Sequence, residues 1–156
     1  MAARAPGRTQ TGARPDGVVG RHLLVGWVAL SLFAGLGLTL ETLNGFKVGW
    51  YLDLANATRR ELWTLAHAHG VLLGLVNLAF AATLRAEGSR FSAAARSLAS
   101  GALIAATVLM PAGFLLGGVV VFGGDPNPAI LLVPPGALAL IVAGTIVAHQ
   151  LASRSR

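Results

Sequence analysis

The chain has 156 residues, of which 54% are apolar and only 12% are charged. A soluble domain has about 25% charged residues, so this sequence has too little polar surface to cover a soluble fold. We therefore expect an integral membrane protein that forms one compact unit. Because the sequence contains no cysteine, it excludes disulfides, thiolate metal sites, iron–sulfur clusters and thiol catalysis.

The formal net charge is +6, from 12 Lys and Arg residues against 6 Asp and Glu residues. Basic residues clustered on one folded polar face would favour nucleic-acid binding. Here they are divided among the two chain ends and the connections between apolar runs. We therefore expect no nucleic-acid partner and take the lipid bilayer as the first partner of the chain.

Four long runs of the sequence contain no Asp, Glu, Lys or Arg, at residues 22–40, 62–84, 97–124 and 126–153. The hydrocarbon core of a bilayer is about 30 Å thick and needs about 20 residues of helix, so each run is long enough to cross it. The predicted fold is all-α, an integral membrane four-helix bundle. Its transmembrane helices are expected at residues 20–43, 61–85, 95–122 and 129–152.

Residues 1–19 have no apolar period, so we expect a disordered basic tail, followed by a transmembrane domain over residues 20–156. Nine Lys and Arg residues lie on the side of the two chain ends and three on the opposite side. The positive-inside rule therefore places both termini in the cytoplasm. Because eleven of the twelve basic residues are arginine, which is typical of GC-rich bacterial genes, we expect the chain in a bacterial inner (plasma) membrane.

The longest connection, residues 44–60, carries several aromatic side chains. Phe46, Trp50 and Leu54 recur at intervals of four, which would place them on one face of a short helix at the outer membrane surface. Aromatic residues at this level commonly anchor a protein at the interface. The segment is interpreted as a connecting loop with an aromatic belt, and a lid over an outward-facing site is the alternative.

The second apolar run contains the polar residues His67, His69 and Asn77. Polar side chains inside a bilayer are costly and face the interior of a helix bundle. At about 100° per residue the two histidines point about 160° apart, so a regular helix does not offer both to one metal ion.

His67 shares one predicted helix face with Asn77 and with the small residues Gly70, Gly74 and Ala81. Small residues four positions apart let a second helix approach closely. This face therefore predicts a packing seam in which His67 and Asn77 form interhelical hydrogen bonds. His69 lies on the other face, toward another helix or a buried cofactor.

Glu41 is expected near the outer end of the first span, at nearly the depth of His67. A glutamate and two histidines at one depth could ligate a transition metal, relay a proton or bond a quinone carbonyl. The candidate cofactor-binding residues are therefore His67, His69, Glu41 and Asn77, and the candidate cofactors are haem b and a transition metal. In the alternative, Glu41 pairs at the membrane surface with Lys47 or another loop residue.

A haem held by two histidines of one chain is disfavoured. We take His149 as the only other histidine within a span, and its predicted separation from His67 along the membrane normal is about 22 Å. A haem with one ligand from this chain, or one shared between subunits through His69, remains an alternative.

The third span and the connection after it carry several glycines. Gly113 and Gly117 lie four positions apart and predict a close-packing face for a neighbouring helix or a second subunit. A homo-oligomer or a larger membrane complex is therefore an expected partner. Residues 123–128 (GGDPNP) predict a short outer hairpin, because glycine permits positive φ and proline fixes φ.

Several short elements carry a resemblance to known proteins: Phe46-Lys47, Tyr51-Leu52-Asp53, Arg59-Arg60, Trp63, the LAHAHG run of residues 65–70, and Asn77. Together they resemble a family of bacterial four-helix integral membrane proteins to which no activity is attached. The His-x-His-Gly element is also similar to helices in haem-copper-oxidase-like membrane proteins, and assigns no catalytic residue here. Small multidrug transporters are similar in having four helices and a glutamate in the first, although Glu41 is expected at the outer edge rather than in mid-membrane.

Three functions follow from these patterns. The first is a small multi-pass membrane protein without enzymatic activity, an accessory or structural membrane subunit. The second is a redox membrane protein that binds haem, a metal or a quinone at the outer-leaflet His and Glu cluster. The third is a small proton-coupled transporter.

Overall fold

The computed structural model describes residues 15–53 and 57–153, which form an all-helical protein with one small hairpin. Its four long helices are α1 (Pro15–Gly45), α3 (Ala57–Glu87), α4 (Ala93–Gly117) and α5 (Val133–Ala152). In this part of the chain, four helical segments are long and apolar enough to cross a membrane. The predicted all-α class and the four apolar helices are therefore confirmed.

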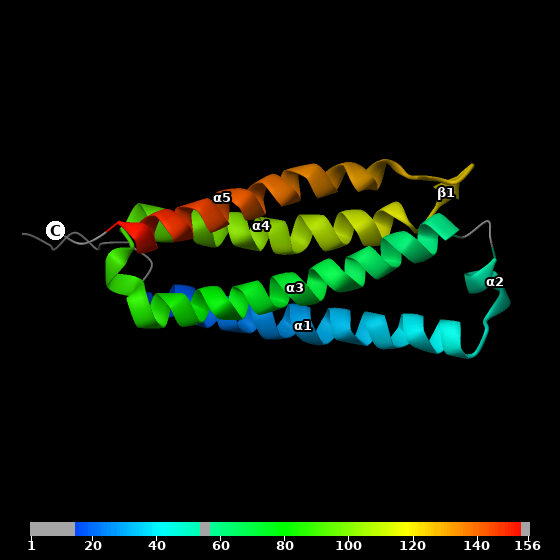
Figure 1. Cartoon of the computed structure of the whole chain (residues 1–156), viewed down its shortest axis with the longest axis horizontal. Helices are drawn as coiled ribbons and strands as arrows, with labels where there is room; N and C mark the ends of the chain where they lie inside the picture. The colour runs from blue at the N-terminus through cyan, green and yellow to red at the C-terminus, as the bar shows by residue number, and fades with distance from the viewer. Residues whose placement is uncertain (1–14, 54–56, 154–156) are drawn as a thin grey trace, which may run out of the picture.

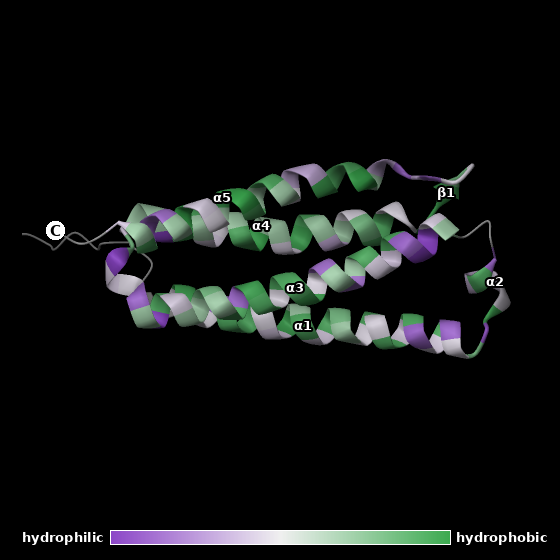
Figure 2. Ribbon diagram, viewed as in Figure 1, coloured by the Kyte–Doolittle hydropathy of each residue, from purple (hydrophilic) through white to green (hydrophobic). Residues whose placement is uncertain are grey.

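The four long helices run alternately in opposite directions along one elongated bundle (Figure 1). Packing follows chain order, because α1 packs against α3, α3 against α4, and α4 against α5. Helices α1 and α5 are therefore the two outer members of the bundle, and the start of α1 lies at the same end as the close of α5 (Figure 1). Hydrophilic residues gather mainly toward the two ends, whereas the middle is mostly apolar (Figure 2). This distribution suits helices that cross a bilayer.

The helices begin and end at somewhat different residues from those predicted. Helix α1 begins at Pro15 rather than at residue 20, so the predicted tail of residues 1–19 overlaps the helix, and residues 1–14 lie outside the described part. Helix α3 is extended at both ends relative to the predicted 61–85. Such shifts are expected, because polar residues continue a helix beyond the apolar core that hydropathy detects.

The predicted end of the third helix at residue 122 is wrong, because α4 ends at Gly117. The Asn127 side chain donates to Leu116 O at 2.7 Å, and its backbone N–H donates to Gly117 O at 3.1 Å. Arg59 Nε of α3 donates to Gly118 O at 3.0 Å. Groups from outside the helix therefore take over carbonyls of its last turn, which would otherwise lack partners.

The predicted short hairpin is confirmed. Strand β1 (Val121–Phe122) pairs antiparallel with β2 (Asp125–Pro126), and the register joins Val121 to Pro126 and Phe122 to Asp125. The two turn glycines have φ values of 59° and 95°, as a two-residue hairpin turn of the mirror-image type requires. A 3₁₀ helix, η3 (Pro128–Leu132), then leads into α5, which begins at Val133 rather than at residue 129.

The connection from α1 to α3 contains α2 (Gly49–Leu52), a helix of one turn. The helix expected to carry Phe46, Trp50 and Leu54 on one face is therefore much shorter than predicted. Phe46 precedes it and is exposed, Trp50 is also exposed, and Leu54 lies outside the described residues. Lys47 has a positive φ of 54°, which separates α1 from α2 because a helix cannot continue through that conformation.

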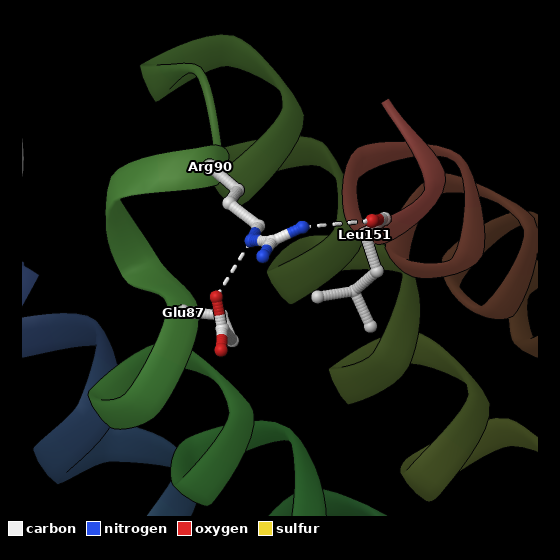
Figure 3. A network of polar contacts seen from close by, with 3 residues as sticks. All are labelled: Glu87, Arg90 and Leu151. Carbon is white, nitrogen blue, oxygen red and sulfur yellow. Dashed lines mark hydrogen bonds and ion pairs between the residues drawn. The ribbon is translucent and has the colours of Figure 1, made fainter. Parts of the chain in front are cut away.

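At the end of the bundle that holds the start of α1, a short 3₁₀ helix η2 (Gly88–Arg90) joins α3 to α4. Arg90 Nε forms an ion pair with Glu87 Oε2 at 2.6 Å, and Arg90 Nη1 donates to Leu151 O of α5 at 3.1 Å (Figure 3). The Ser92 backbone N–H donates to Gln150 Oε1 at 3.2 Å. This connection therefore holds the last turn of α5 against α3 and α4.

Candidate functional site

The face of α3 that carries Gly70 and Gly74 packs tightly against α1. A Cβ added at Gly70 would overlap the Phe33 ring. A Cβ added at Gly74 would lie 2.9 Å from Leu30 N and 3.0 Å from Gly26 O. Since real Cβ atoms do not approach backbone this closely, the contact requires glycine, and the predicted packing seam is confirmed.

His67 lies in the same seam and is half-buried. Its Nδ1 donates to Phe33 O of α1 at 2.7 Å, since a carbonyl oxygen can only accept. A Cβ added at Gly37 would overlap the imidazole ring, so this glycine makes room for it. The interhelical hydrogen bond expected of His67 is present, and it uses Nδ1 of the ring.

His69 faces a different helix from His67. Its Nδ1 donates to Leu65 O, one turn earlier in α3, at 2.9 Å. Its ring lies against Phe114 of α4, with ring centroids 4.9 Å apart and planes inclined by 33°. The opposite orientation of the two histidines, predicted from helix geometry, is therefore observed.

Glu41 is exposed near the end of α1. Within residues 15–53 and 57–153, no hydrogen bond or ion pair joins Glu41 to His67, and no group of three or more His, Asp or Glu side chains could hold a metal ion. The candidate residues Glu41, His67, His69 and Asn77 are thus not brought into one ligand set. A cofactor held by His67 or His69 singly stays a prediction.

The most buried polar cluster of the described residues lies elsewhere, and we call it the α1–α3–α4 polar network. It consists of His22 of α1, Asn77 of α3, and Ser100 and Thr107 of α4, all of which are buried. His22 Nδ1 lies 2.6 Å from Asn77 Oδ1, and His22 Nε2 lies 2.7 Å from Ser100 Oγ. Asn77 Nδ2 donates to Thr107 Oγ1 at 2.8 Å. Three helices are therefore joined by side-chain hydrogen bonds.

The donors and acceptors of the network follow from Asn77. Its amide nitrogen has two hydrogens, which go to Thr107 Oγ1 and to Leu73 O at 2.8 Å. Its oxygen can only accept, so His22 Nδ1 must be the donor. The other nitrogen of the neutral ring then accepts from the Ser100 hydroxyl.

Arg21 and Leu103 provide the last hydrogen-bond partners at the two ends of the network. Arg21 Nη2 donates to Ser100 Oγ at 2.6 Å, and Thr107 Oγ1 donates to Leu103 O at 2.7 Å. Across the described residues, no buried side-chain nitrogen or oxygen lacks a hydrogen-bond partner. A satisfied polar network of this kind fixes the relative positions of the helices that contribute to it.

His22 is not among the predicted site residues. It begins the first apolar run, and the sequence analysis counts only His149 as a further histidine within a span. His22 is instead fully buried, with its ring centroid 4.7 Å from the Phe80 ring centroid and the two ring planes inclined by 84°. A usable signal existed: at about 100° per residue, His22 shares one face of α1 with Gly26, Phe33 and Gly37. That face is the α1 side of the seam.

Two further predictions about packing have clear outcomes. Asn77 was expected to hydrogen-bond across a helix contact, and it does so to both α1 and α4. Gly113 and Gly117 were expected to form a close-packing face, and they contact Val133 and Ile130 of the same chain. These glycines are therefore used within the chain rather than being left open for a second subunit.

The site thus consists of hydrogen bonds that hold helices together, and within the described residues the Nε2 atoms of His67 and His69 take no part in them. Among the described residues, no carboxylate is hydrogen-bonded to His22, whose ring is oriented by the Asn77 amide oxygen instead. Comparison of the chain with protein-family models, with curated proteins and with solved structures finds no match.

Proposed function

We propose that this chain is a small multi-pass membrane protein without enzymatic activity, which serves as an accessory or structural subunit of a membrane complex. The α1–α3–α4 polar network carries this proposal. Its amide, hydroxyl and imidazole groups are bonded to one another or to backbone, so none of them is left to bind a substrate. Polar groups in a membrane site for substrate or ion would instead face a cavity.

The two outer helices support a role in an assembly. Large apolar side chains are exposed along both, including Leu24, Val28 and Leu32 on α1 and Leu138 and Ile141 on α5. In a membrane these faces contact either lipid or the helices of another protein. A subunit needs such faces, whereas an enzyme or carrier needs a polar cavity in addition.

The test is an absorption spectrum, a metal analysis and a mass measurement of the protein purified in mild detergent from its native membrane. We expect no haem absorption, no stoichiometric metal and a mass above that of one chain. A stoichiometric chromophore or metal would contradict the proposal, and so would a monomer without partners.

We also propose that the chain lies in a bacterial inner membrane with both termini in the cytoplasm. The support is the set of arginines at the bundle end where α1 begins and α5 ends, namely Arg21, Arg85, Arg90 and Arg96. Reporter fusions after Arg90 and at the C-terminus should report the cytoplasm, and a fusion after Asp53 should report the outside. An external C-terminus would contradict this topology.

One observation favours a second candidate function, the binding of haem, a metal or a quinone. His69 Nδ1 donates to Leu65 O, so Nε2 is the ring nitrogen that a ligand would meet. Ligating histidines have this arrangement, in which the second nitrogen bonds a carbonyl. No group of three or more His, Asp or Glu side chains in the described residues could hold a metal ion, so further ligands would come from another subunit. Loss of a chromophore in His69→Ala, with the fold retained, would support this second function.

A further inference from the structure

The end of the bundle that holds the connection between α3 and α4 carries more positive charge than its carboxylates neutralise. Arg90 is paired with Glu87 (Figure 3). Arg96 Nη2 donates only to neutral acceptors, Gly88 O at 3.0 Å and Phe91 O at 3.3 Å. Arg85 is exposed, and within the described residues it has no hydrogen bond and no ion pair.

Arg85 and Arg96 line the same pocket, which has a volume of about 410 Å³. The pocket lies between the start of α1, the end of α3, η2 and the first turns of α4. Its lining residues are Val19, Leu84, Arg85, Ala86, Gly88, Ser89 and Arg96. One part of the lining therefore carries two guanidinium groups and a hydroxyl, and the other part is apolar.

We propose that this pocket binds the phosphate head group of an anionic phospholipid. Guanidinium groups bind phosphate through two parallel N–H donors, and Arg85 has all of its donors available in the described structure. The pocket lies where the uncharged run of α3 ends, at Leu84 and Arg85, so in a bilayer crossed by α3 it would lie near the level of the lipid phosphates. Basic pockets between transmembrane helices at this level bind anionic head groups.

The mixed lining favours a lipid over free phosphate. Val19 and Leu84 would contact the glycerol and the first acyl carbons, whereas a free anion would leave them unused. The head group would also bridge α3 and α4 through one arginine from each, so the lipid would add a contact between these helices. This inference holds whether or not the chain is a subunit of a larger complex.

The experiment measures lipid retention by the full chain in a non-ionic detergent, using native mass spectrometry. Phosphatidylglycerol and phosphatidylcholine with identical acyl chains are the two probes. The wild-type chain should retain phosphatidylglycerol preferentially. Each substitution, Arg85→Gln or Arg96→Gln, should weaken that retention about fivefold, and the double variant about 25-fold.

The matched control is Arg90→Gln, which removes the same charge at the same end of the bundle but outside the pocket, and it should leave the preference intact. Arg85→Lys keeps a charge without the guanidinium fork and should fall between wild type and Arg85→Gln. Because Arg85 has no hydrogen bond and no ion pair in the described structure, Arg85→Gln should fold even where Arg96→Gln does not.

Three results would overturn the proposal. The first is equal retention of the two lipids by the wild-type chain. The second is unchanged phosphatidylglycerol retention in Arg85→Gln, which would assign the preference to the chain ends. The third is displacement of the lipid by millimolar inorganic phosphate, which would make the pocket a site for the free anion.

Discussion

The hydrogen bond between His22 and Asn77 offers the sharpest test of the α1–α3–α4 polar network. Asn77→Leu removes the only acceptor of the His22 Nδ1–H, which is fully buried. A buried donor without a partner costs about 1–3 kcal/mol. The lost bond to Thr107 adds about 0.6 kcal/mol, the average for side-chain hydrogen bonds between membrane helices. We therefore expect Asn77→Leu to reduce the free energy of unfolding by roughly 2–4 kcal/mol.

The double variant His22→Leu with Asn77→Leu separates the cost of an orphaned group from the cost of a lost contact. With both partners of the His22–Asn77 bond replaced by apolar side chains, neither leaves the other unsatisfied, and such replacements can be nearly neutral. The double variant should therefore lose about 1–3 kcal/mol less than the sum of the two single losses.

The assay is unfolding in detergent followed by circular dichroism, with SDS as the denaturant. Thr83→Ala is the control, because Thr83 also lies in α3 but bonds only the Ala79 carbonyl of its own helix. It should change the unfolding free energy by less than about 0.5 kcal/mol. Strict additivity of the His22 and Asn77 losses would refute the reasoning, since it would mean that the two side chains do not depend on each other.

Three further outcomes are expected. Gly74→Leu should disrupt the bundle, because its Cβ would lie 2.9 Å from backbone. The control Gly35→Leu, with open space around it, should unfold like the wild type. Equal unfolding of both variants would place Gly74 outside a helix contact. Burial raises the pKa of the Tyr51 hydroxyl, while Arg60 opposes that rise and Glu41 adds to it. Since the folded state then holds the phenol proton more tightly, its stability should fall as pH rises through this raised pKa, above about 10. Tyr51 is the only tyrosine, so tyrosinate absorption measures it directly, and a titration midpoint at or below the ordinary value would contradict its burial. Glu41→Gln and His67→Ala should have additive effects on unfolding, because no contact joins the two residues, and a coupling above about 0.5 kcal/mol would contradict that separation.

Hydropathy and helix period predict most of the fold but only part of the polar network. Each of the four apolar runs is long enough to form a membrane-crossing helix, so the four helices can be predicted. The spacing of Gly70, Gly74 and Asn77 places these three residues on one face of α3. The third helix is predicted too long because the glycine and apolar residues at 118–122 fit the end of a membrane helix as well as they fit a hairpin. What ends α4 is Asn127, whose contact with Leu116 depends on the chain turning back.

The residues that complete the network could not be identified from their own positions. Ser100 and Thr107 are small polar residues that occur in many membrane helices, where their hydroxyls commonly bond the same helix. Only the neighbouring helices decide whether they also bond His22 or Asn77. Sequence period gives the face of a helix, but not the helix that this face meets, so a network shared by three helices appears only in the structure.

Helix α5 stands apart from the other three in the way it is held. The polar network joins α1, α3 and α4, whereas within the described residues side-chain hydrogen bonds tie α5 to the other helices only at its last turn, through Arg90 and Ser92. Elsewhere α5 is held by apolar packing, such as Gly136 against Met110. During synthesis the hydrogen bonds of the α1–α3–α4 polar network can therefore form before α5 is made. We therefore expect α1, α3 and α4 to assemble first. Helix α5 should join them last and should separate from them first on unfolding.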